Sequence, residues 1–205
     1  MKLLISNGRR MIFLVFELAL GLPLLTSIAA AQPQFFVNLM AEKKVKELPA
    51  GPLYWQIENF ATLAQAQAAA SPTSLVTEIT GKVWLCTLGS KDAPTHGGNK
   101  VADIGPVPPI TAPEYLLRLN NSGGPPGATT PVHTHPGSET FYVISGRLSQ
   151  RSSHGIAYVE AGQSMPGHGP GMPMAIISDG ATDLNAIVMF FADATKPFSS
   201  PAKFE

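Results

Sequence analysis

Charged residues are scarce in this sequence. Lysine and arginine number 14, aspartate and glutamate also number 14, and the net charge of the 205-residue chain is zero. The one basic cluster, Lys43, Lys44 and Lys46, is typical of a solvated helix face. A protein that binds nucleic acid needs a basic surface to neutralise the phosphate backbone. The composition therefore argues against nucleic acid as a partner.

Cysteine and long apolar runs are also scarce. Cys86 is the single cysteine, so no internal disulfide can form, and we predict a buried strand thiol. The N-terminal apolar run from Met11 to Leu25 is interrupted by Glu17 and Pro23. A membrane span needs about twenty apolar residues. This run is therefore too short to predict a stable membrane span.

The same run has the features of a secretory signal peptide. It is preceded by the basic residues Lys2, Arg9 and Arg10. Ala29–Ala31 follows as a cleavage site of the A-x-A type. We predict that residues 1–31 are removed and that the protein is exported, either periplasmic or secreted. An uncleaved anchor and a start at Met11 are the alternatives, and both also export the protein.

Residues 32–72 are predicted to form an N-terminal arm and helix. Residues 34–48 are compatible with a helix but weakly patterned, and Leu53–Ile57 is apolar and aromatic. Phe60–Ala70 is rich in alanine and glutamine and free of glycine and proline, which predicts a helix. We expect the arm to pack on the main body, where it covers an edge strand or crosses to a partner in a homodimer.

Residues 73–205 show the pattern of an all-β domain. Short β-like runs are separated by clusters of Gly, Pro, Asn and Asp, which predicts an antiparallel sandwich or barrel. The predicted strands are Ser74–Thr80, Lys82–Leu88, Val101–Ile104, Tyr115–Leu119, Thr140–Ile144, Gly155–Val159, Met174–Ser178 and Leu184–Phe191. Two long loops, Gly89–Lys100 and Gly105–Pro113, are typical of loops that lie over a site.

The polar residues between Gly127 and Gly146 are spaced like metal ligands. In an extended strand His133 and His135 project to one side, with a rise of roughly 6–7 Å between them. The Pro-Gly-Ser turn that follows lets the carboxylate of Glu139 return to the same point. The segment predicts a metal site of two histidines and one carboxylate. A pair of ordinary polar strand residues is the alternative.

This segment resembles the first motif of the cupin superfamily. That motif runs Gly, five residues, His-x-His, three or four residues, Glu, six residues, Gly, and Gly127 to Gly146 matches every fixed position. The resemblance extends over about residues 112–192, and the chain is also similar to exported bacterial single-cupin proteins. It implies a cupin jelly-roll barrel that holds one transition-metal ion (Fe, Mn, Cu, Zn or Ni) in its mouth.

The second cupin motif, over residues 162–178, departs from the family pattern. Met174 stands where the family has a third histidine, and a thioether favours Cu(I) over hard divalent ions. Three interpretations follow: His133, His135 and Glu139 suffice alone, His168 from a glycine-rich loop replaces the missing ligand, or no ion binds. Met174 is itself either an apolar pocket wall or a ligand.

Other side chains are weaker candidates. Tyr142, Met174 and His168 are predicted to contact a substrate, although packing is the default for an aromatic strand residue. Arg118 either faces solvent or lines the barrel. His96 and His154 are expected in loops at the surface.

The cupin resemblance implies chemistry on a small molecule. Cupin enzymes include dioxygenases, isomerases, decarboxylases and lyases, and the fold alone does not choose among them. Glu139 is then a metal ligand or the general base. The alternatives are a module that binds a small molecule without turning it over, and a structural cupin that forms a homodimer.

Overall fold

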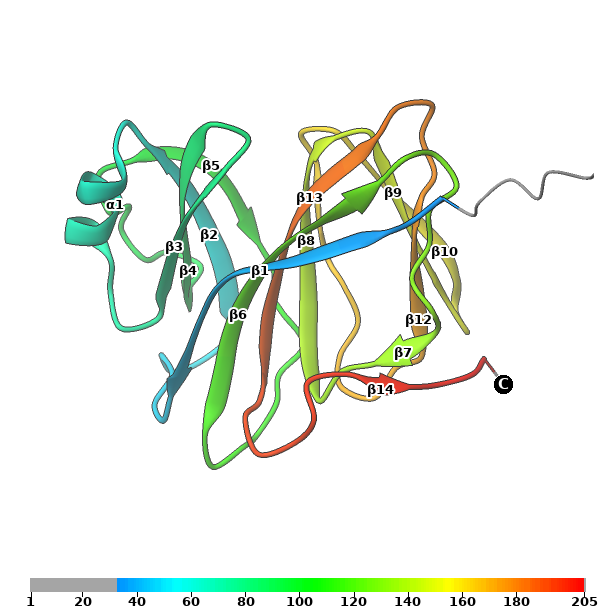
Figure 1. Ribbon diagram of the computed structural model, residues 1–205. Coiled ribbons are helices and arrows are strands. Elements are labelled where there is room, and N and C mark those ends of the chain that lie inside the picture. Colours follow the sequence, from blue (N-terminus) through cyan, green and yellow to red (C-terminus); the bar gives the residue numbers. More distant parts are fainter. Residues whose placement is uncertain (1–32, 205) are drawn as a thin grey trace, which may run out of the picture. The chain divides into compact units, whose positions relative to one another are not determined.

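The computed structural model describes residues 33–204, and the predicted signal peptide lies outside the described residues. Within these residues the chain forms antiparallel β-sheets and one short helix, as Figure 1 shows. The all-β class predicted from the sequence is confirmed. No helix of this part of the chain is long and apolar enough to cross a membrane.

The strands form three sheets. The central sheet has the order β1 (Phe36–Val45), β6 (Tyr115–Gly124), β13 (Leu184–Asp193), β8 (Gly137–Ser145), β11 (Ser164–Pro166). The second sheet has the order β10 (Gly155–Glu160), β9 (Arg147–Ser152), β12 (Met174–Ser178), β7 (His133–Thr134), β14 (Ser200–Pro201). The third sheet has the order β3 (Ser74–Ile79), β4 (Lys82–Ser90), β2 (Leu53–Phe60), β5 (Asn99–Ile104).

The central sheet has a hydrophobic core on each face. Successive side chains of a strand point to opposite faces. On β13, Met189 and Phe191 pack with Trp55 and Trp84 of the third sheet, in what we call the closed core. Phe190, which lies between them in sequence, packs instead in a core shared with the second sheet. We call this the cavity side, because the candidate site lies there.

The N-terminal region contains two strands, β1 and β2, that the sequence did not predict. Residues 34–48 were compatible with a helix, but they contain the strand β1, which pairs with β6 along the edge of the central sheet. Ten residues of backbone hydrogen bonding and packing there outweigh a weak local preference. The predicted helix is present as α1 (Leu63–Ala69), whose N-cap Thr62 accepts from the backbone N–H of Gln65.

All the predicted strands are present, most of them longer at one end or both. The strands that sequence patterning missed are β1, β2, β7, β9, β11 and β14. The strands β3, β4 and β5 lie with β2 in the third sheet, so they cover the closed core and do not wall the cavity side. The boundaries predicted at residues 32–72 and 73–205 stay a prediction.

Candidate metal centre

The three residues of the predicted metal motif come together in the structure. His133 opens the two-residue strand β7, and the chain then turns at Pro136 into β8, which carries Glu139. One ligand atom from each of His133, His135 and Glu139 lies within 4.8 Å of the others. His135 Nε2 is 4.0 Å from Glu139 Oε1. The turn has therefore brought the carboxylate back to the imidazole pair.

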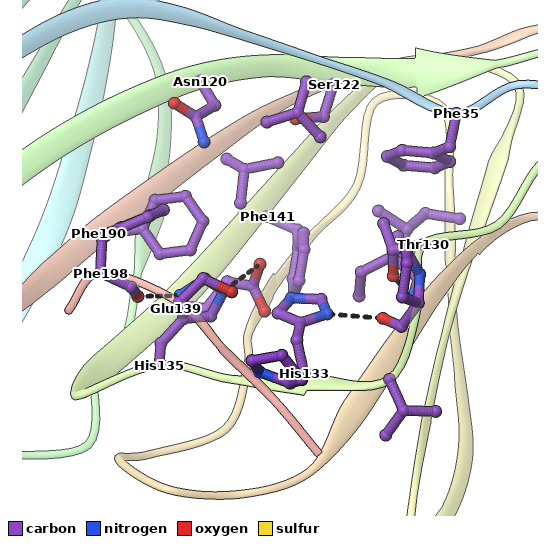
Figure 2. Close-up of a pocket in the computed structure, with 18 residues that line it drawn as sticks. Phe35, Asn120, Ser122, Thr130, His133, His135, Glu139, Phe141, Phe190 and Phe198 are labelled. Carbon is purple, nitrogen blue, oxygen red and sulfur yellow. Dashed lines mark hydrogen bonds and ion pairs between the residues drawn. The ribbon is translucent and has the colours of Figure 1, made fainter. Parts of the chain in front are cut away.

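Each imidazole is oriented by a backbone carbonyl. His133 Nδ1 is 2.8 Å from the carbonyl oxygen of Pro131, and His135 Nδ1 is 2.7 Å from that of Phe198 (Figure 2). A carbonyl oxygen only accepts, so Nδ1 carries the proton in both rings. The Nε2 lone pair is then left free in each neutral ring, which is the state a metal-binding histidine needs.

Burial sets the protonation of the site. Glu139 is 3% exposed, and the loss of solvent raises its pKa to about 8. His135 is 5% exposed, and burial lowers its pKa to about 4, with smaller contributions from the nearby charges of His133 and Arg118. The carbonyl of Phe198 acts in the opposite direction on that ring. A cation bound beside the buried carboxyl would stabilise its charged form, and the neutral ring of His135 could bind the same cation.

The donor set fits a transition-metal ion. Imidazole nitrogen suits Zn, Cu, Fe and Ni, and a carboxylate suits Mn as well. Glu139 has a weak polar partner, Gln150, whose Nε2 lies 3.4 Å from Oε2. The ligand atoms of this group therefore have few competing interactions among the described residues. His133, His135 and Glu139 would hold the ion.

Met174 lies beside the site but is held by another residue. It is fully buried and pairs with His133 across β12 and β7. Its Sδ atom accepts a hydrogen bond from Gln150 Nε2 at 3.1 Å. Gln150 therefore sits between Met174 and Glu139. Gln150 was not predicted from the sequence, because β9 is mostly polar. Leu148 and Gln150 are two residues apart in this strand and so point to the same face, which could have indicated that Gln150 is buried.

The structure does not bring the side chains of Tyr142 and His168 to the three ligands. Tyr142 lies on the face of β8 opposite Glu139, and its ring packs on Trp84 in the closed core. The His168 ring lies against His154, with ring centroids 5.9 Å apart. Its backbone carbonyl alone reaches the motif, where it accepts from the Glu139 N–H at 3.3 Å.

Two other candidates also have structural partners. His96 was expected to face solvent, but its Nδ1 lies 2.9 Å from Oε1 of the buried Glu58, whose carboxylate also accepts from the backbone N–H groups of His96 and Gly98. Hydrogen bonds to a buried carboxylate hold this loop in place. The Arg118 guanidinium lies over the ring of Phe198, 4.2 Å from its centroid.

A cavity of about 370 Å³ adjoins the three ligands on the cavity side. Most of its wall is apolar: Phe35, Phe141, Leu148, Ile176, Val188, Phe190 and Phe198. Asn120 and Ser122, from β6, are polar wall residues that sequence reasoning did not single out. The N-terminal Phe35 and Val37 and the C-terminal Phe198 to Pro201 contribute to the same wall. Both ends of the described chain therefore help to enclose the cavity.

The comparisons with known proteins identify structural neighbours only. No protein-family profile and no curated protein matches the sequence. The DMSP lyase DddQ from Ruegeria pomeroyi DSS-3 is 21% identical with a TM-score of 0.37, over 42% of this chain and 43% of that one. An uncharacterised protein with a double-stranded β-helix domain from Klebsiella pneumoniae is 22% identical with a TM-score of 0.37, over 42% of this chain and 75% of that one.

A third neighbour is described as a cupin superfamily protein, from Desulfitobacterium hafniense DCB-2. It is 9% identical with a TM-score of 0.34, over 38% of this chain and 68% of that one. Of the DMSP lyase DddQ, the matched region spans less than half of the length. The description of this third neighbour names the superfamily whose first motif the segment from Gly127 to Gly146 resembles.

Proposed function

We propose that this protein binds one transition-metal ion through His133, His135 and Glu139 and acts on a small molecule held in the adjoining cavity. The observation that carries the proposal is the anchoring of both imidazoles through Nδ1, at 2.8 Å to Pro131 and 2.7 Å to Phe198. Ordinary polar strand residues do not need two backbone carbonyls to fix one tautomer. Metal ligands commonly have such partners.

The residues of the site have separate tasks in this proposal. A bound ion supplies Lewis-acid polarisation of an oxygen ligand or redox chemistry with dioxygen. The carbonyls of Pro131 and Phe198 hold the two rings in place. Glu139, whose pKa is raised to about 8 by burial, can hold or release a proton near neutral pH when no cation is present. Apolar side chains make up most of the cavity wall beside these groups.

Elemental analysis tests the proposal. The variant His133→Ala/His135→Ala removes two ligands, and His154→Ala/His168→Ala is a matched control that removes the other adjacent pair of histidines. We expect about one transition-metal atom per wild-type and control chain after reconstitution, and loss of that metal in the first variant. Equal metal content in both double variants would contradict the proposal.

We also propose that the protein is exported and cleaved after Ala31. The proposal rests on the basic residues, the apolar run and the A-x-A sequence described above. N-terminal sequencing of the protein recovered from the periplasm or medium should begin at Gln32. A chain recovered from the cytoplasm with its first residues intact would contradict it.

A further inference from the structure

The cavity beside the candidate metal centre contains almost no charge. Among the described residues that line it, Glu139 is the one carboxylate, and none is lysine or arginine. Arg118 lies behind this wall: it stacks on Phe198, and its Nη1 is 3.5 Å from Glu42 Oε2. An anionic ligand inside the cavity would therefore have no cationic side chain as its partner, and burying an unpaired charge is costly.

Two of the polar sites of the cavity lie apart from each other, and Ser122, Thr130 and Ser199 also line it. The three ligands form one end, and Asn120 lies on the opposite wall, with aromatic rings between them (Figure 2). Asn120 is 1% exposed, and its Oδ1 accepts from Arg118 Nε at 3.0 Å. Its Nδ2 makes no hydrogen bond to any residue of the described chain and points into the cavity in Figure 2. Asn120 therefore offers one fixed donor.

The size of the cavity sets the size of its ligand. An apolar cavity of about 150 Å³ is enough to hold benzene. At about 370 Å³, this cavity is more than twice that size. The phenylalanine rings at positions 35, 141, 190 and 198 present flat apolar surfaces around it. Aromatic side chains pack favourably against other rings.

We propose that the ligand is a neutral, flat molecule of about two fused rings with an oxygen group at each end. One oxygen faces His133, His135 and Glu139, and the other accepts a hydrogen bond from Asn120 Nδ2. The first contact rests on the proposed function, whereas the apolar wall and Asn120 do not. Small polar acids are poor ligands for the metal-free cavity, because they would leave its rings uncovered and would find no cationic side chain in its wall.

Calorimetric titration of the metal-free protein tests the proposal. The probes 2-naphthol and 2-naphthoate have the same rings but differ in charge at pH 7. We expect 2-naphthol to bind at least about tenfold more tightly, because the carboxylate would be buried without a cation. Equal affinities, tighter binding of 2-naphthoate, or failure of 2-naphthol to bind would each overturn the proposal.

The donor at Asn120 is tested with a second oxygen on the probe. We expect 2,6-dihydroxynaphthalene to bind about two- to tenfold more tightly than 2-naphthol, the range for one added hydrogen bond. In Asn120→Ala this advantage should disappear while 2-naphthol still binds. An advantage that persists in Asn120→Ala would overturn the role of this residue.

Two variants locate the binding. Ser122→Phe places a ring inside the cavity and should weaken 2-naphthol binding at least about tenfold. Val37→Arg adds a cation at an exposed position of the wall and should raise 2-naphthoate affinity, whereas Leu39→Arg, on the same strand but outside the wall, should not. Val37 is exposed, so Val37→Arg remains a valid test even if the buried ring of Ser122→Phe prevents folding. Affinities unchanged in both Ser122→Phe and Val37→Arg would place binding elsewhere and overturn the proposal.

The two proposals fail separately. Stoichiometric metal that depends on His133 and His135, without 2-naphthol binding, would remove the ligand class and leave the metal site. Binding of 2-naphthol by a protein that never retains metal would remove the proposed function and leave the ligand class.

Discussion

The two faces of the central sheet use the same strands for different purposes. On β13, Met189 and Phe191 point into the closed core, where Trp55 and Trp84 fill the space between the central and third sheets. The intervening Phe190 points to the other face, where it borders a cavity of about 370 Å³. The period of two along a strand thus separates residues that stabilise the fold from residues that form the site.

The two faces also differ in how much they stabilise the fold. Side chains that line a cavity have no atoms packed against them there, and burial disfavours the charged form of a carboxyl. No buried residue of the closed core is a carboxyl, and its largest side chains are almost fully buried, although a pocket borders it at Leu53, Val107 and Phe191. Most of the packing stability should therefore come from the closed core, while the cavity side should determine binding.

The largest effect on stability is expected in the closed core. Trp55 is fully buried there, so Trp55→Ala should lower the free energy of unfolding by about 3–5 kcal/mol. The metal content of the folded variant should not change, since Trp55 is on the face away from the ligands. Urea unfolding and elemental analysis measure the two quantities. Loss of metal in the folded Trp55→Ala variant would contradict the separation of stability and metal binding between the two faces.

A pH effect should come next, and it belongs to the cavity side. The pKa of Glu139 is raised from its ordinary 4.5 to about 8, so unfolding releases a proton between these values and the metal-free protein loses stability as pH rises through them. Glu139→Gln removes this loss. Its stability should match the wild type near pH 4.5 and exceed it by roughly 2–4 kcal/mol near pH 8.5.

The partner group His135 does not affect that comparison. Its pKa is lowered to about 4, so its own contribution is present above pH 6.5 and is lost as pH falls toward 4, equally in both proteins. Urea unfolding at several pH values gives the difference. A difference that stays constant with pH would contradict the burial of an ionisable carboxyl at this position.

Removal of the C-terminal segment should have an intermediate effect. A chain that ends at Pro197 loses the Phe198 carbonyl that holds His135, and with it β14 beside β7. Metal affinity should fall about 10- to 100-fold, as for other lost partners of ligating histidines. A chain that ends at Ala202 keeps both features and is the control. Metal competition titrations of the two chains should differ; equal affinities would contradict the role of Phe198.

The smallest effect is expected at Gln150. Its Nε2 lies 3.4 Å from Glu139 Oε2 and 3.1 Å from Met174 Sδ, and both contacts are weak for a hydrogen bond. Gln150→Leu should change the free energy of unfolding by about 0.5–1.5 kcal/mol and metal affinity by less than about tenfold. A larger loss of metal would show that Gln150 is itself part of the metal site.

The sequence was most informative where the pattern is local. The motif of His133, His135 and Glu139 and the strand Met174–Ser178 were visible as spacing and alternation. The strand β1 was not, because its stability depends on β6, far along the chain. The Phe198 carbonyl carries no sequence signal, since every residue has one. The face of β8 on which Tyr142 lies depends on its position relative to Glu139. The turn before β8 prevented this assignment from the sequence.

The most direct test is an X-ray absorption spectrum of the reconstituted protein at the edge of its bound metal. We expect nitrogen and oxygen neighbours at about 2.0–2.2 Å with the outer-shell scattering of two imidazoles, and no sulfur. The imidazole signal should disappear in His133→Ala/His135→Ala. A sulfur neighbour near about 2.3 Å, or a spectrum unchanged in that variant, would contradict a site built from His133, His135 and Glu139.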